Sequence, residues 1–440
     1  MRTAKAGWCE TEITPPLGLP MGGRGPRFSP GKSILDPLEA GAIFLQDPDG
    51  NRTLWVSLDL IGFSYSFGAG LRYGLASICE VPIDSIVLNF AHIHSGPMVN
   101  FDLYAADLDK PEELESYQAT LRERILLTAR RACDSASPAD LTLHSGESDL
   151  GINRRNRDGK GQIGMRPNPD GVYNPDLWVL DIESAGRRCV VFSYGCHPVI
   201  VYGYAWQGIS ADFPGATRRQ LEDSLGDGVE AHFIQGLAGN VRPRVLADLK
   251  TGTFRKSRPP DLDDAARLLA GDVVKALERE GEELNLEIEA AEGSFLARRD
   301  PEAVKPLSHW QELASSEQEI LRNLGRYWSR RMRDGPPLSR SVPCSIGLIR
   351  LDRAHEVAWL SGEPVAEWQG LIRGWLGDDQ VVVWGYCQHV SDYIPTDELI
   401  AEGGYEVVAS NRYAETGPGP FAPSLNSSMR DAIISLNSRL

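Results

Sequence analysis

The sequence predicts an α/β protein whose core is a mixed β-sheet covered by helices. Apolar runs of strand length, rich in Val, Ile and Leu, alternate along the chain with amphipathic stretches of helical period. No segment of roughly 20 to 50 residues recurs, which excludes solenoids and propellers. With 440 residues, of which 42% are hydrophobic, the chain can bury a sizeable core. We therefore expect one catalytic domain over residues 1–440.

The predicted strands are short apolar runs, most of which end at turn-forming residues. In chain order they cover residues 42–45, 54–60, 86–92, 178–182, 189–194, 231–234, 346–351, 357–360 and 380–384.

The predicted helices are stretches in which apolar residues recur every three or four positions. They cover residues 112–134, 216–225, 263–280, 309–331, 364–376 and 429–436. The charged helix 309–331 lies between Pro-containing segments, so residues 300–340 are expected to form a helical embellishment. Residues 151–174 have no periodicity and are predicted to form a long loop, which in compact domains is usually functional.

Net charge limits the partners of the chain. It has 45 Lys and Arg against 61 Asp and Glu, a formal balance of −16, which argues against nucleic acid and anionic membranes as partners. The N-terminal residues contain no apolar stretch typical of a secretion signal, and no apolar run approaches the ~20 residues of a membrane span. We expect a cytoplasmic protein with a small-molecule substrate.

The segment HIHSGP contains the first candidate metal ligands, at the end of predicted strand 86–92. A side-chain period of two places His92 and His94 on one face, roughly 6–7 Å apart at the backbone. The two rings could share a metal, or one could bind it while the other acts on substrate. The alternative is a hydrogen-bonded pair with a structural role.

Two further candidates follow other predicted strands. His197 comes directly after strand 189–194 in the segment GCHP, and Glu363 lies in SGEP between strand 357–360 and the next helix. Strand ends are where α/β proteins place catalytic groups. Taken alone, His197 is expected to have a structural role, and Glu363 could equally well be a helix cap. Together with the HxH pair, they form a common catalytic zinc set with a position left for water.

These motifs, in this order, resemble the neutral, non-lysosomal ceramidase family. The resemblance covers roughly residues 7–410 and is carried mainly by ITPPLG (13–18) and HIHSGP (92–97). It is supported by VSLDLIG (56–62), INRR (152–155), His197, QGLAGNVRP (235–243), SGEP (361–364) and the region of Tyr393.

The resemblance implies a zinc ion bound by His92, His197, Glu363 and Tyr393, and a zinc-activated water that hydrolyses an amide. It assigns positions around the reacting carbonyl to His94, Arg154 and Tyr405. Proton transfer suits His94, and oxyanion stabilisation suits the other two residues.

The chain departs from the family at three points. Arg242 occupies the position of a family serine, which excludes a serine nucleophile there and suits a substrate with a carboxylate or phosphate. A surface ion pair is the alternative role for Arg242. The leader and the C-terminal β-sandwich domain of the secreted family members are also not expected. We therefore expect a bacterial-type relative that hydrolyses a soluble small molecule and is not specific for ceramide.

Two other functions remain open, and a further one is disfavoured by the sequence. An esterase or lactonase would use the same site, because activated water attacks esters more easily than amides. A catalytically inactive binding protein of the same fold is the third possibility. A TIM-barrel amidohydrolase also begins with an HxH motif, but the chain lacks its early placement and its regular βα octet.

Overall fold

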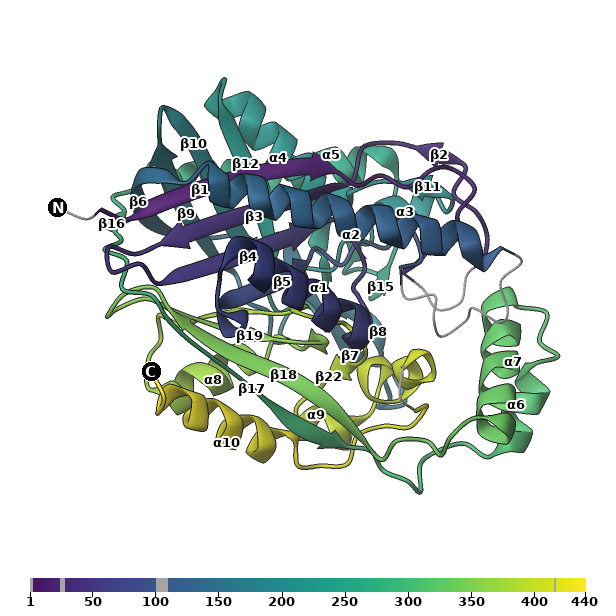
Figure 1. Ribbon diagram of the computed structural model, residues 1–440. Coiled ribbons are helices and arrows are strands. Elements are labelled where there is room, and N and C mark those ends of the chain that lie inside the picture. Colours follow the sequence, from purple (N-terminus) through teal and green to yellow (C-terminus); the bar gives the residue numbers. More distant parts are fainter. Residues whose placement is uncertain (1–2, 24–27, 100–109, 415–416) are drawn as a thin grey trace.

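Two stacked β-sheets with helices on both outer faces form the molecule, which is described by a computed structural model covering residues 3–23, 28–99, 110–414 and 417–440. Helices α1, α2, α4 and α5 cover the larger sheet, and α8 and α10 cover the smaller one (Figure 1). This arrangement confirms the predicted α/β class with a mixed sheet.

The strands are β1 (Lys5–Glu12), β2 (Ser33–Ile34), β3 (Glu39–Gln46), β4 (Arg52–Leu58), β5 (Ile86–Phe90), β6 (Ser137–Glu147), β7 (Gly151–Arg157), β8 (Ile163–Asn168), β9 (Asp176–Ser184), β10 (Arg187–Tyr194), β11 (Gly208–Ile209), β12 (Val229–Gln235), β13 (Val241–Pro243), β14 (Ala247–Asp248), β15 (Thr253–Phe254), β16 (Glu282–Glu283), β17 (Glu289–Arg298), β18 (Ser341–Arg350), β19 (Glu356–Leu360), β20 (Glu363–Pro364), β21 (Val382–Trp384) and β22 (Tyr393–Ile394).

The helices are α1 (Tyr65–Cys79), α2 (Pro111–Asp134), α3 (Val201–Tyr204), α4 (Asp212–Leu225), α5 (Pro259–Leu277), α6 (Leu307–Leu313), α7 (Glu319–Asp334), α8 (Trp368–Leu376), α9 (Asp397–Glu402) and α10 (Leu425–Asn437), with a π-helical turn η5 (Tyr405–Ala409) and short 3-10 turns η1 (Ile83–Ser85), η4 (Arg244–Leu246) and η6 (Ser410–Tyr413).

The larger sheet has the strand order β12-β10-β9-β6-β1-β3-β4-β5 and contains both parallel and antiparallel pairs. Its two end strands approach each other where they finish. The Asn89 side chain donates to the Gln235 carbonyl at 3.1 Å and accepts from the Gln235 N–H at 2.8 Å. The loops that follow β5 and β10 therefore open at one end of the molecule, although these strands are far apart in the hydrogen-bonding order.

The smaller sheet has the order β17-β18-β19-β21 and packs on the inner face of the larger one. Tryptophans fill this interlayer core, with Trp55 and Trp384 in edge-to-face contact at 5.1 Å between ring centroids. Two single bridges join this sheet region to the ends of the larger sheet: Asn89 of β5 pairs with Cys387, three residues after β21, and Trp384 of β21 pairs with Gly236, the residue after β12. This seam holds the loops that carry the candidate ligands in fixed positions.

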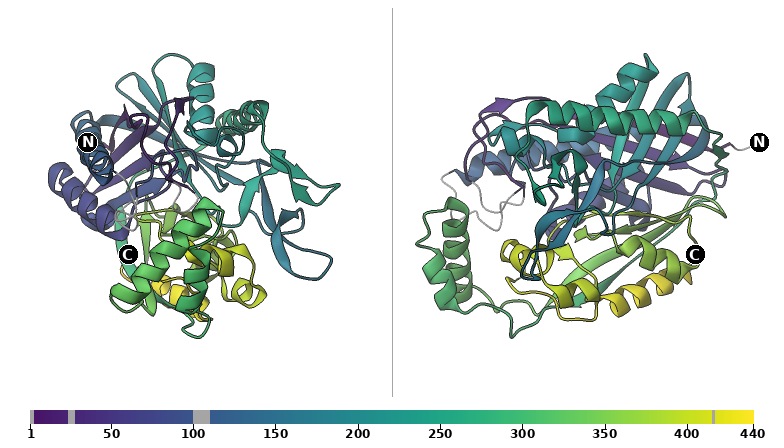
Figure 2. Two further views of the ribbon diagram at one scale, coloured as in Figure 1. Left: turned by 90° about the vertical axis from the view of Figure 1, so that its right-hand side faces the viewer. Right: turned by 180° about the vertical axis from the view of Figure 1, so that it is seen from behind.

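Three sequence predictions of local structure were wrong. Residues 151–174 are not one loop, because β7 and β8 form a hairpin that stands out from the sheets (Figure 2). Arg154 and Arg155 of β7 form buried ion pairs with Glu406, so this strand is polar in sequence although it is buried. Predicted helix 309–331 is two helices, α6 and α7, which lie antiparallel. The strand predicted to reach His92 ends at Phe90.

No helix among the described residues combines the length and apolar character needed to cross a bilayer.

Candidate metal centre

His92 occupies a left-handed backbone position directly after β5, with φ of 63°. Its ring is buried, and Nδ1 lies 2.7 Å from the Ile61 carbonyl oxygen. A carbonyl oxygen only accepts hydrogen bonds, so Nδ1 carries the proton and Nε2 presents a lone pair. Backbone contacts thus fix both the orientation and the tautomer of this imidazole.

His197 is fixed in the same way after β10. Its Nδ1 donates to the Ala238 carbonyl at 2.5 Å, and its backbone N–H donates to the Val241 carbonyl at 3.2 Å. Burial, followed by the nearby Arg154 charge, lowers the pKa of His197 to about 4. The ring is therefore neutral at pH 7, with an Nε2 lone pair directed into the site.

Glu363 and Tyr393 lie opposite each other in the short parallel pair β20–β22. The Glu363 N–H donates to the Asp392 carbonyl at 2.8 Å, which holds this register. Glu363 Oε2 lies 3.1 Å from His92 Nε2 and 3.2 Å from His197 Nε2. The Tyr393 hydroxyl is 3.2 Å from the same His197 nitrogen. The four predicted ligands, from four parts of the chain, thus converge at one point.

This group of atoms fits a cation. The Glu363 side chain is only 14% exposed and lies against the two imidazoles. Two nitrogen lone pairs then face a carboxylate oxygen that accepts no hydrogen bond from any described residue. Buried acceptors without a donor are costly unless a positive charge joins them. Nitrogen and oxygen donors of this kind suit zinc.

His94 completes a triangle of imidazoles. One ring nitrogen from each of His92, His94 and His197 lies within 4.8 Å of the others. The His94 Nε2 is buried and has no hydrogen-bond partner among the described residues. Burial, together with His92 and His197, lowers the pKa of His94 well below its ordinary value. A neutral imidazole with a free nitrogen beside the ligands can bind the same ion or accept a proton.

The two histidines of the HxH motif are not placed by the expected strand period. The turn at His92 separates them from β5, yet their ring centroids lie 5.1 Å apart at an angle of 82°. The left-handed backbone at His92, rather than the alternation of a strand, brings both rings into the site.

Arg154 reaches the site from β7, and its described side-chain hydrogen bonds go to Tyr393 and Glu406. Its Nη2 donates to the Tyr393 hydroxyl at 3.0 Å and its Nε donates to Glu406 Oε1 at 2.9 Å. Neither contact uses Nη1. Arg155 donates to the second oxygen of Glu406 at 2.7 Å. Glu406 is 1% exposed, and its two guanidinium partners outweigh burial and lower its pKa.

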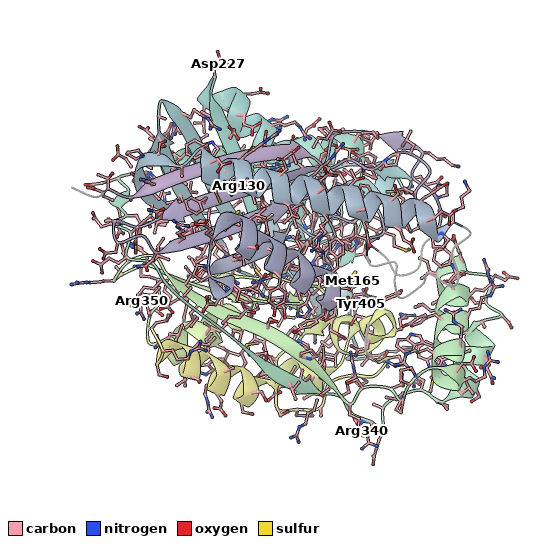
Figure 3. The ribbon with its side chains drawn as sticks, viewed as in Figure 1. Arg130, Met165, Asp227, Arg340, Arg350 and Tyr405 are labelled. Carbon is pink, nitrogen blue, oxygen red and sulfur yellow. The ribbon has the colours of Figure 1, made fainter. Side chains whose placement is uncertain are left out.

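Tyr405 begins the π-helical turn η5 beside this cluster. Its ring centroid lies 5.7 Å from that of Tyr393 and 5.5 Å from the Arg154 guanidinium carbon. Figure 3 labels Tyr405 close to Met165 of β8, a strand that packs against η5. The predicted catalytic residues Arg154 and Tyr405 therefore flank the predicted ligand Tyr393.

Arg242 lies on β13, one residue after Val241, the residue that holds the His197 backbone. Its guanidinium packs over the Phe254 ring at 4.7 Å and contacts the Met165 sulfur at 3.4 Å. None of its described contacts is with the four ligands. The sequence neighbour Val241 and the contacts with Phe254 and Met165 thus place Arg242 beside the site, on the side of Met165.

Two buried residues of the site were missed by sequence reasoning. Glu406, next to Tyr405, offered no signal because an isolated glutamate usually lies on the surface. Tyr386 packs its ring on His92 at 4.5 Å, and its buried hydroxyl has no hydrogen-bond partner among the described residues. Its position two residues after β21 was the one available signal, since the other site residues also follow strands.

Comparisons with known proteins agree on the fold. No protein-family model matches the chain, and no curated protein matches it. Among solved structures, a ceramidase complexed with C2 superposes with a TM-score of 0.74 at 18% identity, covering 100% of this chain and 76% of that one. The neutral ceramidase from Pseudomonas aeruginosa gives 0.72 at 18% identity, with 100% and 75% coverage. The protein has a neutral ceramidase-like fold, which confirms the resemblance found in the sequence.

Proposed function

We propose that this protein is a zinc-dependent hydrolase that cleaves an amide (N-acyl) bond with water as the nucleophile. The observation that carries the proposal is the convergence of the Nε2 atoms of His92 and His197 on the Glu363 carboxylate, at 3.1 and 3.2 Å. His92, His197, Glu363 and Tyr393 would hold the metal. Zinc, when bound, lowers the pKa of water towards neutrality and polarises a carbonyl. The names of the two structural neighbours, both ceramidases, support an amide bond.

His94 is the proposed proton carrier. Its Nε2 has no hydrogen-bond partner in the described part of the chain and its lowered pKa keeps the ring neutral, so it can accept a proton as water attacks and return it to the departing nitrogen. Arg154 and Tyr405 are the proposed oxyanion donors. Arg154 has Nη1 left for this role after its contacts with Tyr393 and Glu406, and those contacts hold the guanidinium in place.

The proposed substrate is a soluble small molecule with an anionic end. The net charge of −16 argues against work at an anionic membrane. Arg242 supplies a guanidinium on β13, the strand whose Val241 carbonyl holds the His197 backbone. We expect Arg242→Gln to raise KM about tenfold for N-acyl substrates that end in a carboxylate and to leave KM unchanged for matched neutral amides. Equal effects on both substrates would remove Arg242 from substrate selection.

Metal analysis of the full chain tests the central proposal. We expect one zinc per chain, activity that is lost on chelation and regained on adding zinc, and loss of both metal and activity in His92→Ala and His197→Ala. His94→Ala should keep the zinc and lose activity. Folded protein that binds no zinc even after reconstitution would exclude the proposal, and loss of zinc in His94→Ala would make His94 a ligand.

An esterase or lactonase is the second candidate, because the same site attacks esters more readily than amides. Turnover of matched N-acyl and O-acyl substrates distinguishes the two activities. Zinc binding without turnover of either would favour a binding protein.

A further inference from the structure

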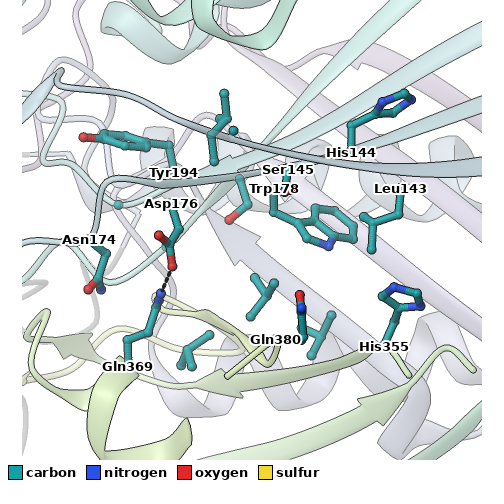
Figure 4. Close-up of a pocket in the computed structure, with 18 of the residues that line it drawn as sticks. Leu143, His144, Ser145, Asn174, Asp176, Trp178, Tyr194, His355, Gln369 and Gln380 are labelled. Atoms are coloured by element: carbon teal, nitrogen blue, oxygen red, sulfur yellow. Dashed lines mark hydrogen bonds between the residues drawn. The ribbon is translucent and has the colours of Figure 1, made fainter. Parts of the chain in front are cut away.

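A second cavity, of about 520 Å³, lies between the two sheets and contains none of the proposed metal ligands among its lining residues (Figure 4). Strands β6, β9 and β10 of the larger sheet form one wall. Strands β19 and β21 and helix α8 form the other. Its volume falls in the range of small-molecule sites, roughly 300 to 1,000 Å³.

One row of side chains crosses the wall formed by the larger sheet. The register pairs Ser145 of β6 with Trp178 of β9, and Trp178 with Ser193 of β10, so the three residues share one face. Ring contacts with Trp55 at 6.3 Å and Trp384 at 5.8 Å fix the indole of Trp178. Ser193 is 4% exposed, and neither serine hydroxyl has a hydrogen-bond partner among the described residues. The Trp178 ring thus lies between the hydroxyls of Ser145 and Ser193, which are available to bind a ligand.

The next row outward contains two carboxylates opposite each other, Glu147 and Asp176. Asp176 accepts hydrogen bonds from Gln369 at 2.7 Å and from Arg373 at 2.8 Å. Glu147 has no ion-pair partner among the described residues, and Figure 4 shows Gln380 across the cavity from Trp178. The lining groups without a described side-chain partner therefore include an acceptor at Glu147, hydroxyls that donate and accept, an amide that does both, and the guanidinium of Arg279.

We propose that this cavity binds a saccharide of one or two rings. Sugar hydroxyls both donate and accept, which matches the mixed set of uncommitted groups, and the apolar face of a sugar ring can lie against Trp178. The lining sets the carboxylates of Glu147 and Asp176 beside the guanidinium of Arg279, which suits a neutral polyhydroxyl ligand better than a simple anion. A simple cation would find Asp176 already paired with Arg373. The site is separate from the metal centre and does not depend on the hydrolase proposal.

Titration of the full chain with D-glucose, maltose and N-acetyl-D-glucosamine tests this site by saturation-transfer NMR and calorimetry. We expect saturable binding of at least one of them with Kd in the ~0.1–5 mM range. Glu147→Gln should weaken binding about tenfold by removing a charged acceptor. Ser145→Tyr should abolish binding by filling the cavity.

Asp140→Asn is the matched control, because Asp140 lies on β6 and faces the other side of the sheet. It should bind sugar as the unmodified chain does. Melting temperature and zinc content verify that each variant is folded. Absence of saturable binding for all three sugars, unchanged affinity in Ser145→Tyr, or tighter binding of inorganic phosphate or spermidine than of any sugar would each overturn the proposal.

Discussion

Glu406 gives the sharpest test of how the candidate site is held together. Its carboxylate accepts from Arg154 at 2.9 Å and from Arg155 at 2.7 Å, and the side chains of all three residues are at most 4% exposed. Glu406→Gln keeps the shape and one acceptor oxygen but removes the negative charge. Two buried guanidinium groups would then lack a counter-charge at this point. Breaking a buried ion pair in this way costs about 3–5 kcal/mol, and we expect the lower end because the amide oxygen remains.

The size of the effect follows from the burial of the pair. A loss of about 3 kcal/mol in the free energy of unfolding lowers the folding equilibrium constant more than a hundredfold. The same substitution should lower activity, because Arg154 loses the contact that orients it towards Tyr393. Zinc affinity should fall only as far as the Arg154–Tyr393 contact weakens, since none of the described contacts of Glu406 is with an imidazole.

Glu402→Gln is the matched control. Glu402 also pairs with Arg155, at 3.2 Å, but its side chain is 40% exposed. An exposed pair of this kind contributes less than about 1 kcal/mol. Urea denaturation of both variants, with zinc analysis and kinetics at saturating substrate, compares a buried and an exposed carboxylate on the same arginine. If Glu406→Gln is as stable as Glu402→Gln, the reasoning about the buried cluster is wrong.

The pH dependence of the Glu406 contribution has a defined sign. The pKa of Glu406 is lowered in the folded protein from an ordinary value of 4.5. The stabilisation is therefore complete above pH 4.5 and is lost as the pH falls through the folded-state pKa. The difference in unfolding free energy between the original chain and Glu406→Gln should stay constant from about pH 5 to pH 8 and decrease in acid.

Three further predictions concern the metal site and a buried histidine. Tyr393→Phe keeps the ring and removes the hydroxyl near His197, so zinc affinity should fall about tenfold or more, measured by chelator competition; unchanged affinity would remove Tyr393 from the ligand set. A Cβ on Gly239 would lie 2.7 Å from the Pro364 carbonyl oxygen, so Gly239→Ala should displace β20 and weaken zinc binding. Gly159 has open space around it, so Gly159→Ala should leave zinc affinity unchanged. Equal zinc affinities in the two variants would contradict this. His232 is buried with neither ring nitrogen bonded to a described residue, and burial, then Arg218, lowers its pKa from 6.5 to about 3. Its stability contribution is therefore lost as the pH falls from 6.5 towards 3, and His232→Leu should flatten the acid limb of the stability curve by up to about 1.4 kcal/mol per pH unit; an unchanged limb would show that His232 does not titrate in this way.

The sequence predicted best those strands that are buried on both faces. β4, β5, β10 and β12 appear as continuous apolar runs, and all four were found within a few residues of their true ends. The hairpin β7–β8 was missed because its first strand carries Arg154 and Arg155, which are buried against Glu406. Hydrophobic periodicity cannot reveal a strand whose buried groups are charged and paired within the fold.

The candidate ligands were identifiable because each follows a strand or a short turn, but their convergence was not predictable from spacing. β5 and β10, which precede the two imidazoles, are separated in the sheet order by five other strands. Only the approach of the end strands β5 and β12, joined by Asn89 and Gln235, brings the two loops together. This contact depends on the twist accumulated across the whole sheet, which no local pattern records.

Arg154 shows how the structure changes the interpretation of a residue that the sequence singled out. The resemblance implied a donor to the reacting carbonyl, whereas the described contacts direct its Nη2 to the Tyr393 hydroxyl. Burial and the Glu363 charge raise the pKa of Tyr393 well above its ordinary value, and the nearby guanidinium opposes that rise. A tyrosine ligand must lose its proton to bind a metal strongly, so the guanidinium and the metal would favour the same phenolate. We therefore expect Arg154→Lys, which keeps the charge but loses the planar fork, to lower zinc affinity as well as activity.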